Sequence, residues 1–215
     1  MKQSLEFILV VTLILGSTGL AGSAPDAQGV PAGQALRQLL DGNGRYVQNH
    51  PEHPNQRPSA AAQHPLAVIL SCSDSRVPPE IVFDQGVGDL FIVRVAGNTY
   101  DRLALESIEY AIDHLGANLI VVMGHDQCGA VTAAVNSYPD AHVGPMIQNI
   151  YAAVRESKGK PGDPTSNAIS ANAILIAQRL AHEAHFAAKL KSGQLKVVAA
   201  RYGLDSGKVQ ILTPQ

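Results

Sequence analysis

Two cysteines and one histidine carry the most specific chemistry in this sequence of 215 residues. Cys72 follows the apolar run Leu66-Ala67-Val68-Ile69-Leu70-Ser71, and Cys128 lies three residues after His125 in Gly124-His125-Asp126-Gln127-Cys128-Gly129. Two thiolates and an imidazole suit zinc, and three protein ligands leave a fourth position for water, as catalytic zinc sites do. The sequence has no third cysteine that could close a structural site. The spacing therefore predicts a catalytic zinc centre with ligands Cys72, His125 and Cys128.

An acid and a base follow Cys72 at alternate positions, in Cys72-Ser73-Asp74-Ser75-Arg76. Two thiolates formally cancel the charge of a divalent ion, so water bound to that ion is acidified less than beside three neutral histidines. Groups outside the ligand set must then orient the resulting hydroxide. Asp74 can accept its hydrogen bond, and Arg76 can hold Asp74 through a bidentate pair. We therefore predict Asp74 and Arg76 as the catalytic residues.

Buried strands are expected to carry these ligands to one edge of a sheet. Apolar runs predict strands at 66–71, 90–95, 119–123, 195–201 and 208–212. Helical patterns separate them, most clearly after Asp101, which is the expected N-cap of a helix ending near Gly116. Apolar strands alternating with helices predict an α/β fold, with a mainly parallel central sheet flanked by helices and an antiparallel C-terminal edge strand. Ligands in such sheets lie beyond the carboxyl ends of the strands, where Cys72 and His125 are expected.

The remaining pattern predicts further helices and an N-terminal arm. Helices are expected over 34–48, 130–135, 144–156 and 166–190, and a short one opens at Pro78-Pro79-Glu80. The first leads into the proline-rich segment His50–Pro58, which cannot continue a helix. We expect residues 25–65 to form a helix and extended arm able to pack away from their own domain. Residues 66–215 are expected to form the zinc-binding α/β catalytic domain.

The first residues differ in kind from the rest. Met1-Lys2 precedes an apolar core over 7–15 and a small-residue exit through Gly22-Ser23-Ala24, which is typical of a secretory signal peptide over 1–24. The apolar core is too short to span a bilayer comfortably. The sequence thus predicts an exported protein, periplasmic or secreted, with no membrane attachment after cleavage. A net charge of −2 and the absence of a basic block give no support for a nucleic-acid partner.

Export makes a structural disulfide between Cys72 and Cys128 the main alternative to a metal site. Asp74, Arg76 and His125 favour the metal, because a disulfide would need none of them. Their position beside a ligand also argues against a simple surface ion pair between Asp74 and Arg76. His182-Glu183-Ala184-His185 is one residue short of the His-Glu-x-x-His zinc pattern, so a solvated helix face is expected there.

Taken together, Cys72-Ser73-Asp74-Ser75-Arg76 and His125-Asp126-Gln127-Cys128-Gly129 resemble the paired signature of the β-class carbonic anhydrases. The resemblance covers most of the chain after the signal peptide. It includes the stretches 88–98, 107–111, 195–198 and 207–209.

This resemblance implies a carbonate dehydratase, a lyase that reversibly hydrates carbon dioxide to bicarbonate and a proton. It implies one zinc ion per chain on Cys72, His125 and Cys128, with hydroxide on the zinc as the nucleophile and Asp74 and Arg76 as the catalytic dyad. It also implies a homodimer or a dimer of dimers, with the N-terminal helix reaching over the partner. Gln85 and Gly129 are its candidates for substrate binding.

Two other functions stay open from the residues alone. A hydrolase of carbonyl sulfide or carbon disulfide could use the same scaffold, because these linear substrates differ from carbon dioxide only in the pocket shape and access that they require. A non-catalytic exported binding protein stapled by Cys72 and Cys128 is the more remote alternative. If zinc is absent, the two thiols of an exported chain are predicted to oxidise to that disulfide.

Overall fold

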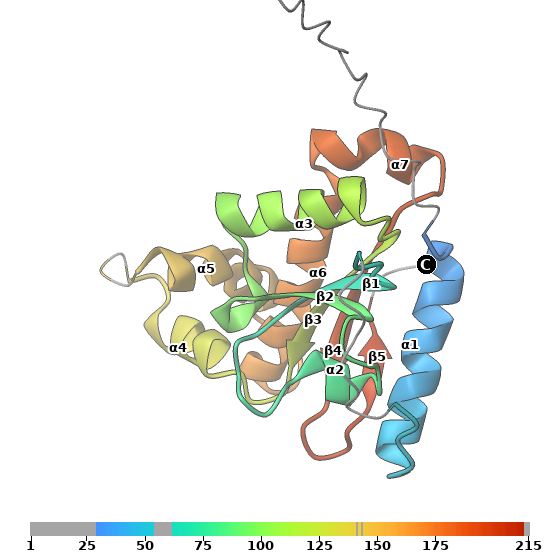
Figure 1. Cartoon of the computed structure of the whole chain (residues 1–215). Helices are drawn as coiled ribbons and strands as arrows, with labels where there is room; N and C mark the ends of the chain where they lie inside the picture. Colours follow the sequence, from blue (N-terminus) through green and yellow to red (C-terminus); the bar gives the residue numbers. More distant parts are fainter. Residues whose placement is uncertain (1–28, 54–61, 141, 143, 213–215) are drawn as a thin grey trace, which may run out of the picture.

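The computed structural model describes residues 29–53, 62–140, 142 and 144–212. At its centre lies a five-stranded sheet in the order β2-β1-β3-β4-β5 (Figure 1). The strands are β1 (Ala67–Ser71), β2 (Leu90–Arg94), β3 (Leu119–His125), β4 (Lys196–Tyr202) and β5 (Val209–Ile211). Neighbouring strands are parallel except for β4 and β5, which are antiparallel. The predicted α/β class, with a mainly parallel sheet and an antiparallel C-terminal edge, is confirmed.

The two central strands explain where the core lies. Every residue of β1 and β3 is buried, as expected for apolar runs covered on both faces. Successive side chains of a strand point to opposite faces, so Val68 and Leu70 enter one hydrophobic cluster while Ala67 and Ile69 enter the other. Both central strands end at the same edge of the sheet.

Helices cover both faces of this sheet (Figure 1). Residues of α3 (Arg102–His114) and α6 (Pro164–Ala181) pack on one face, and residues of α1 (Ala32–Val47) and α2 (Pro79–Val82) pack on the other. A third cluster joins α4 (Gly129–Ser137), α5 (Pro145–Ser157) and α6. The predicted cap is present, because the Asp101 carboxylate accepts a hydrogen bond of 2.9 Å from the backbone N–H of Ala104.

Helix α1, which the sequence predicts as able to pack away from its own domain, packs against the sheet of its own chain in this structure. Ala32, Ala35 and Leu39 recur at helical spacing and are at most 3% exposed, in one cluster with the central strands. A Cβ on Gly42 would lie 1.9 Å from the carbonyl oxygen of Phe83, so this glycine permits the close approach of α1 to the end of α2. Within the single chain, α1 is thus part of the core.

An anchored segment follows α1. The Asp84 carboxylate accepts hydrogen bonds from the backbone N–H groups of Glu52 and His53 and from Arg45 Nε, the last at 2.6 Å. Burial opposes its ionisation, but these donors lower the pKa of Asp84 to about 2. The start of the predicted arm is therefore tied to the body by one carboxylate.

The prediction of one continuous helix over 166–190 is wrong for the second half of that range. Helix α6 ends at Ala181, and a short 3₁₀ helix η2 (Ala184–Phe186) and α7 (Ala187–Lys191) follow. Glu183 is extended, with φ −63° and ψ 126°. This break lets Phe186 enter the core completely buried, while Glu183 accepts a hydrogen bond from the Tyr100 hydroxyl. No glycine or proline marks the break, which is why the sequence pattern missed it.

The predicted signal peptide lies outside the described residues, as does most of the proline-rich segment. Among the residues that the structure does describe, no helix combines the length and the apolar character that crossing a membrane requires.

Candidate metal centre

The structure brings the three predicted ligands together at one edge of the sheet. Cys72 directly follows β1, His125 is the last residue of β3, and Cys128 is the N-cap of α4. Their ligating atoms all lie within 4.8 Å of one another, and the residues are 5%, 0% and 1% exposed, respectively. In the described part of the chain, no other group of three such side chains converges in this way.

A tight turn returns the chain from His125 to Cys128. Gln127 adopts a φ of 54°, a left-handed conformation that costs a non-glycine residue free energy. The turn places the Cys128 sulfur 3.9 Å from the Cys72 sulfur, although these residues come from different strand-helix units. The backbone strain is thus used to complete the cluster.

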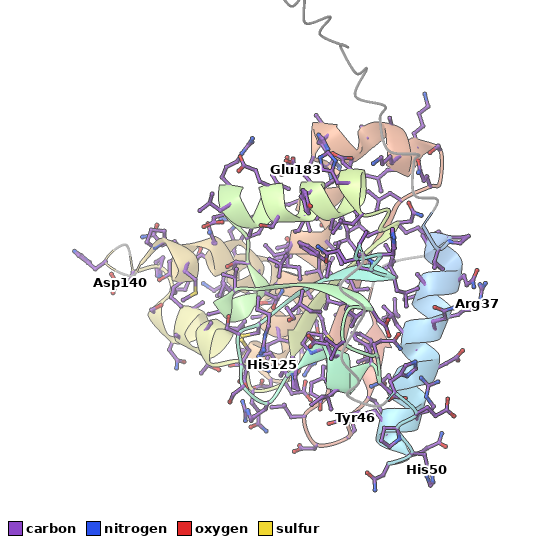
Figure 2. All side chains as sticks on the ribbon, in the orientation of Figure 1. Arg37, Tyr46, His50, His125, Asp140 and Glu183 are labelled. Atoms are coloured by element: carbon purple, nitrogen blue, oxygen red, sulfur yellow. The ribbon has the colours of Figure 1, made fainter. Side chains whose placement is uncertain are left out.

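The ring of His125 is oriented for a ligand. Its Nδ1 atom lies 2.8 Å from the backbone carbonyl oxygen of Asp126. A carbonyl can only accept, so Nδ1 carries the proton and Nε2 of the neutral ring presents its lone pair. Nε2 is buried and has no hydrogen-bond partner. A buried unpaired nitrogen is costly, and a metal ion would satisfy it. Figure 2 shows His125 among the interior side chains, whereas Arg37, His50 and Asp140 lie at the periphery.

The sulfurs of Cys72 and Cys128 lie 3.9 Å apart, so the thiol of one can donate its proton to the other. The hydrogen bond from the Cys128 thiol, with smaller help from the Gly97 N–H, lowers the pKa of Cys72 against the effect of burial. The same hydrogen bond and burial raise the pKa of Cys128, although backbone N–H groups at the start of α4 lower it in part. The helix terminus alone therefore does not make Cys128 a thiolate. A cation between the sulfurs would displace this proton.

These features fit a divalent zinc ion. The cluster offers two sulfurs and one imidazole nitrogen, which are the donor types that zinc prefers, and its only unsatisfied atom is the nitrogen that would bind. Both cysteines are free. The predicted donor set is thus brought together in a form suited to the metal.

Asp74 and Arg76 lie beside the cluster as the sequence predicts. Arg76 donates from Nε and an Nη to the two carboxylate oxygens of Asp74 at 3.0 and 2.8 Å, and its backbone N–H adds a third bond. This pairing holds the pKa of Asp74 well below its usual range. Asp74 Oδ2 lies 3.9 Å from His125 Nε2, so an ionised carboxylate faces the atom that is free to bind.

Sequence reasoning missed two arginines that fix the site. Arg94, at the end of β2, donates to the carbonyl oxygens of Cys72 and Asp74 at 3.0 and 2.5 Å. Arg201, on β4, donates to the Asp126 carboxylate at 2.6 Å, and the carbonyl of Asp126 orients His125. In both cases the available signal was an arginine that follows an apolar run at the carboxyl end of a strand.

The remaining candidates lie in different parts of the structure, and only Gly129 is next to a metal ligand. Gln85 borders a separate cavity of about 420 Å³ beside α1, and its amide donates to the carbonyl oxygens of Phe83 and Asp84. Gly129 begins α4 next to Cys128, and nothing lies within 4 Å of where its Cβ would be. His182 and His185 contact Gln178 and Asp113, respectively, so they do not converge on a second metal site.

Comparison with known sequences identifies the family of this chain. The family model described as carbonic anhydrase matches residues 67–209. "Carbonic anhydrase 2" of Mycobacterium tuberculosis strain H37Rv is 36% identical over 188 residues, which cover 81% of this chain and 89% of that protein. "Carbonic anhydrase" of Mycolicibacterium smegmatis is 37% identical over 199 residues, covering 87% and 95%.

Solved structures support the fold. The β-carbonic anhydrase CcaA has a TM-score of 0.61 at 26% identity over 70% of this chain and 80% of that one. The Coccomyxa β-carbonic anhydrase in complex with acetazolamide has a TM-score of 0.64 at 23% identity over 83% and 82%. With the family model spanning well over half of the sequence, the chain belongs to the β-carbonic anhydrase family and is a carbonic anhydrase, a lyase.

Proposed function

We propose that this carbonic anhydrase is zinc-dependent, with one zinc ion on Cys72, His125 and Cys128, and that it hydrates carbon dioxide reversibly to bicarbonate and a proton. The observation that carries the proposal is the buried Nε2 of His125, which has no partner and belongs to a cluster with two free cysteine sulfurs. When bound, zinc lowers the pKa of a water molecule and so supplies a nucleophile near neutral pH.

Residues of the chain orient the reacting water. Asp74, kept ionised by Arg76, accepts a hydrogen bond from the reacting water and turns its lone pair toward carbon dioxide. Arg94 fixes the backbone on which both Cys72 and Asp74 lie. Because Arg76 holds the Asp74 carboxylate and Arg94 holds the Asp74 backbone, little reorganisation is needed when negative charge develops on the oxygen atoms of the attacked carbon dioxide.

Proton release needs a path to solvent. The side chain of Arg76 is 52% exposed, whereas His125 is completely buried, so the Asp74 side of the cluster is its solvent-facing side. We place the exit of the proton and bicarbonate there.

The proposed assembly is a homodimer or a dimer of dimers. β2 is an edge strand, with no strand on its outer side among the described residues. The neighbouring helix α3 exposes Leu103 and Tyr110, which are seven residues apart and hence on one helix face, by 73% and 50%. Tetrameric β-carbonic anhydrases of Sordaria macrospora share the fold, with a TM-score of 0.61 at 22% identity. Gln85 lies outside its own metal centre, so a role in substrate binding would require a second protomer.

We also propose that the chain is exported, because of the basic start, apolar core and small-residue exit of residues 1–24. The signal is tested by expressing the full chain and a chain lacking these residues in a bacterium. Periplasmic recovery of only the full chain, shortened at its N-terminus, supports export, and equal recovery of both in the cytoplasm contradicts it.

The central experiment measures metal and rate on one sample. Purified protein should contain about one zinc per chain and accelerate carbon dioxide hydration in stopped flow near pH 8. Zinc-loaded protein with no rate above buffer refutes the proposal. Parallel assays with carbonyl sulfide and carbon disulfide test the hydrolase alternative. Two free thiols in the denatured, metal-stripped chain exclude the disulfide-stapled binding protein.

A further inference from the structure

A buried asparagine on α6 reaches the metal centre through the backbone of one residue, Gly97. Asn172 is 1% exposed and lies in the middle of α6. Its Nδ2 donates to the carbonyl oxygen of Gly97 at 2.7 Å. The N–H of Gly97, in turn, donates to the Cys72 sulfur at 3.2 Å. The residues that form this relay are 75 and 25 positions apart in sequence, so only the fold connects them.

Gly97 cannot be replaced in this relay by a residue with a side chain. Its φ is 71°, which favours glycine. A Cβ would also lie 2.7 Å from Cδ1 of Ile150, which is fully buried on α5. The Gly97 residue is therefore confined by packing at its Cα, and the amide of Asn172 fixes the direction of the carbonyl that follows this Cα, while the N–H that precedes it donates to Cys72.

Helix α6 is placed to hold the backbone of Gly97 rigidly. It crosses β3 at Gly124, where a Cβ would lie 3.5 Å from both the Ala173 Cβ and the Ile169 carbonyl oxygen. Gly124 directly precedes His125. The helix that carries Asn172 is thus fixed against the strand that carries a second ligand.

We infer that Asn172 is a positioning residue for the Cys72 sulfur and acts through the backbone of Gly97; this inference rests on the proposed zinc site. A backbone N–H directed at a metal-bound thiolate fixes the sulfur and withdraws charge from it. Without the amide of Asn172, the Gly97 carbonyl loses its side-chain donor, and the backbone on both sides of the Gly97 Cα is freer to turn its N–H away from the sulfur.

The test replaces Asn172 by leucine, which has nearly the same size but donates no hydrogen bond. We expect Asn172→Leu to release zinc to a chelator at least roughly 10-fold faster than the unaltered chain. In the cobalt(II)-loaded protein, the sulfur-to-metal charge-transfer band should move to longer wavelength, because the sulfur loses a donor. Both readouts are independent of turnover.

Two matched variants separate positioning from general loosening. Asn167→Leu removes an asparagine on the same helix that donates to the carbonyl oxygens of Lys160 and Pro161, away from the metal centre. Ile176→Ala opens a cavity under α6, where Ile176 is 2% exposed. Both should keep the zinc release rate and the cobalt band of the unaltered chain. Asn172→Ala, which cannot clash, replaces the leucine variant if that one does not fold.

Each outcome bears on one claim. Zinc release and a cobalt band unchanged in the Asn172 variant overturn the positioning role, as does equal zinc loss in Ile176→Ala. If the unaltered chain binds no zinc, the proposed function fails together with the inference. If it binds zinc but does not hydrate carbon dioxide, only the proposed function fails.

Discussion

The surroundings of the Asp74 carboxylate suit it to orient a reacting water. It is held by three hydrogen bonds from Arg76 and faces the free nitrogen of His125 without belonging to the converging donor set. Such a group can orient a reacting water, and it does so only when it is ionised and accepts a hydrogen bond from that water. The proximity of Arg76 keeps it ionised well into the acid range.

Asp74→Asn should therefore retain zinc while turnover falls by roughly 10–100-fold, the range found for groups that orient metal-bound ligands. Zinc content and stopped-flow rates on the same preparation check both parts. Asp205→Asn, at an exposed position, is the matched control and should change neither. Loss of zinc in Asp74→Asn would instead make Asp74 part of the ligand set.

At the scale of elements, one buried carboxylate joins the segment after α1 to the body. Asp84→Asn should lower the urea midpoint at neutral pH, because the amide is a weaker acceptor for the N–H groups of Glu52 and His53 and removes the buried charge that pairs with Arg45. The folded-state pKa of about 2 is depressed from an unfolded value near ~3.9. The stabilisation is thus present above about pH 4 and is lost as the pH falls toward 2.

Urea midpoints of the two proteins, measured from pH 7 down to pH 2, check this sign. The difference should be constant at neutral pH and shrink below about pH 4. A difference that grows on acidification would mean that another group controls the segment. Asp89→Asn serves as the comparison, since the Asp89 side chain accepts only the local N–H of Gly86 among the contacts described.

The elements show what sequence patterns can and cannot predict. The strands and the antiparallel edge follow from apolar runs, and the ligands follow from residue types that only a metal site requires together. The break before η2 depends on Phe186 entering a core that forms from distant segments. Asn172, Arg94 and Arg201 act on backbone atoms or on residues that are neighbours only in the fold, so no spacing reveals them.

At the scale of the whole molecule, an exposed face predicts assembly. Replacing both Leu103 and Tyr110 by glutamate should convert the proposed oligomer to monomers, because buried charges without partners oppose association. Light scattering coupled to size exclusion measures the mass directly. Met146→Glu, on α5, is the control and should leave the mass unchanged. A monomeric unaltered chain would refute the proposed dimer.

The metal-free chain offers a last prediction. Its two sulfurs lie 3.9 Å apart, and both thiols are free. Hydrogen peroxide should accept two electrons and two protons from them, giving a Cys72–Cys128 disulfide and water. Thiol counting after metal removal and peroxide treatment measures this. Zinc-loaded protein should keep its thiols. If the metal-free thiols persist, the oxidation prediction fails, while the zinc assignment remains.

Cys72 and Cys128 are 56 positions apart in sequence, and this separation gives their oxidation a consequence for thermal screening of the enzyme. Closing a loop of that length restricts the unfolded chain by about 4 kcal/mol in the simplest entropy treatment. An oxidised, metal-free sample would then have a higher melting temperature than a reduced sample, although only the reduced sample can still be activated by zinc. Ranking preparations or variants by melting temperature would select protein that has lost its ligands.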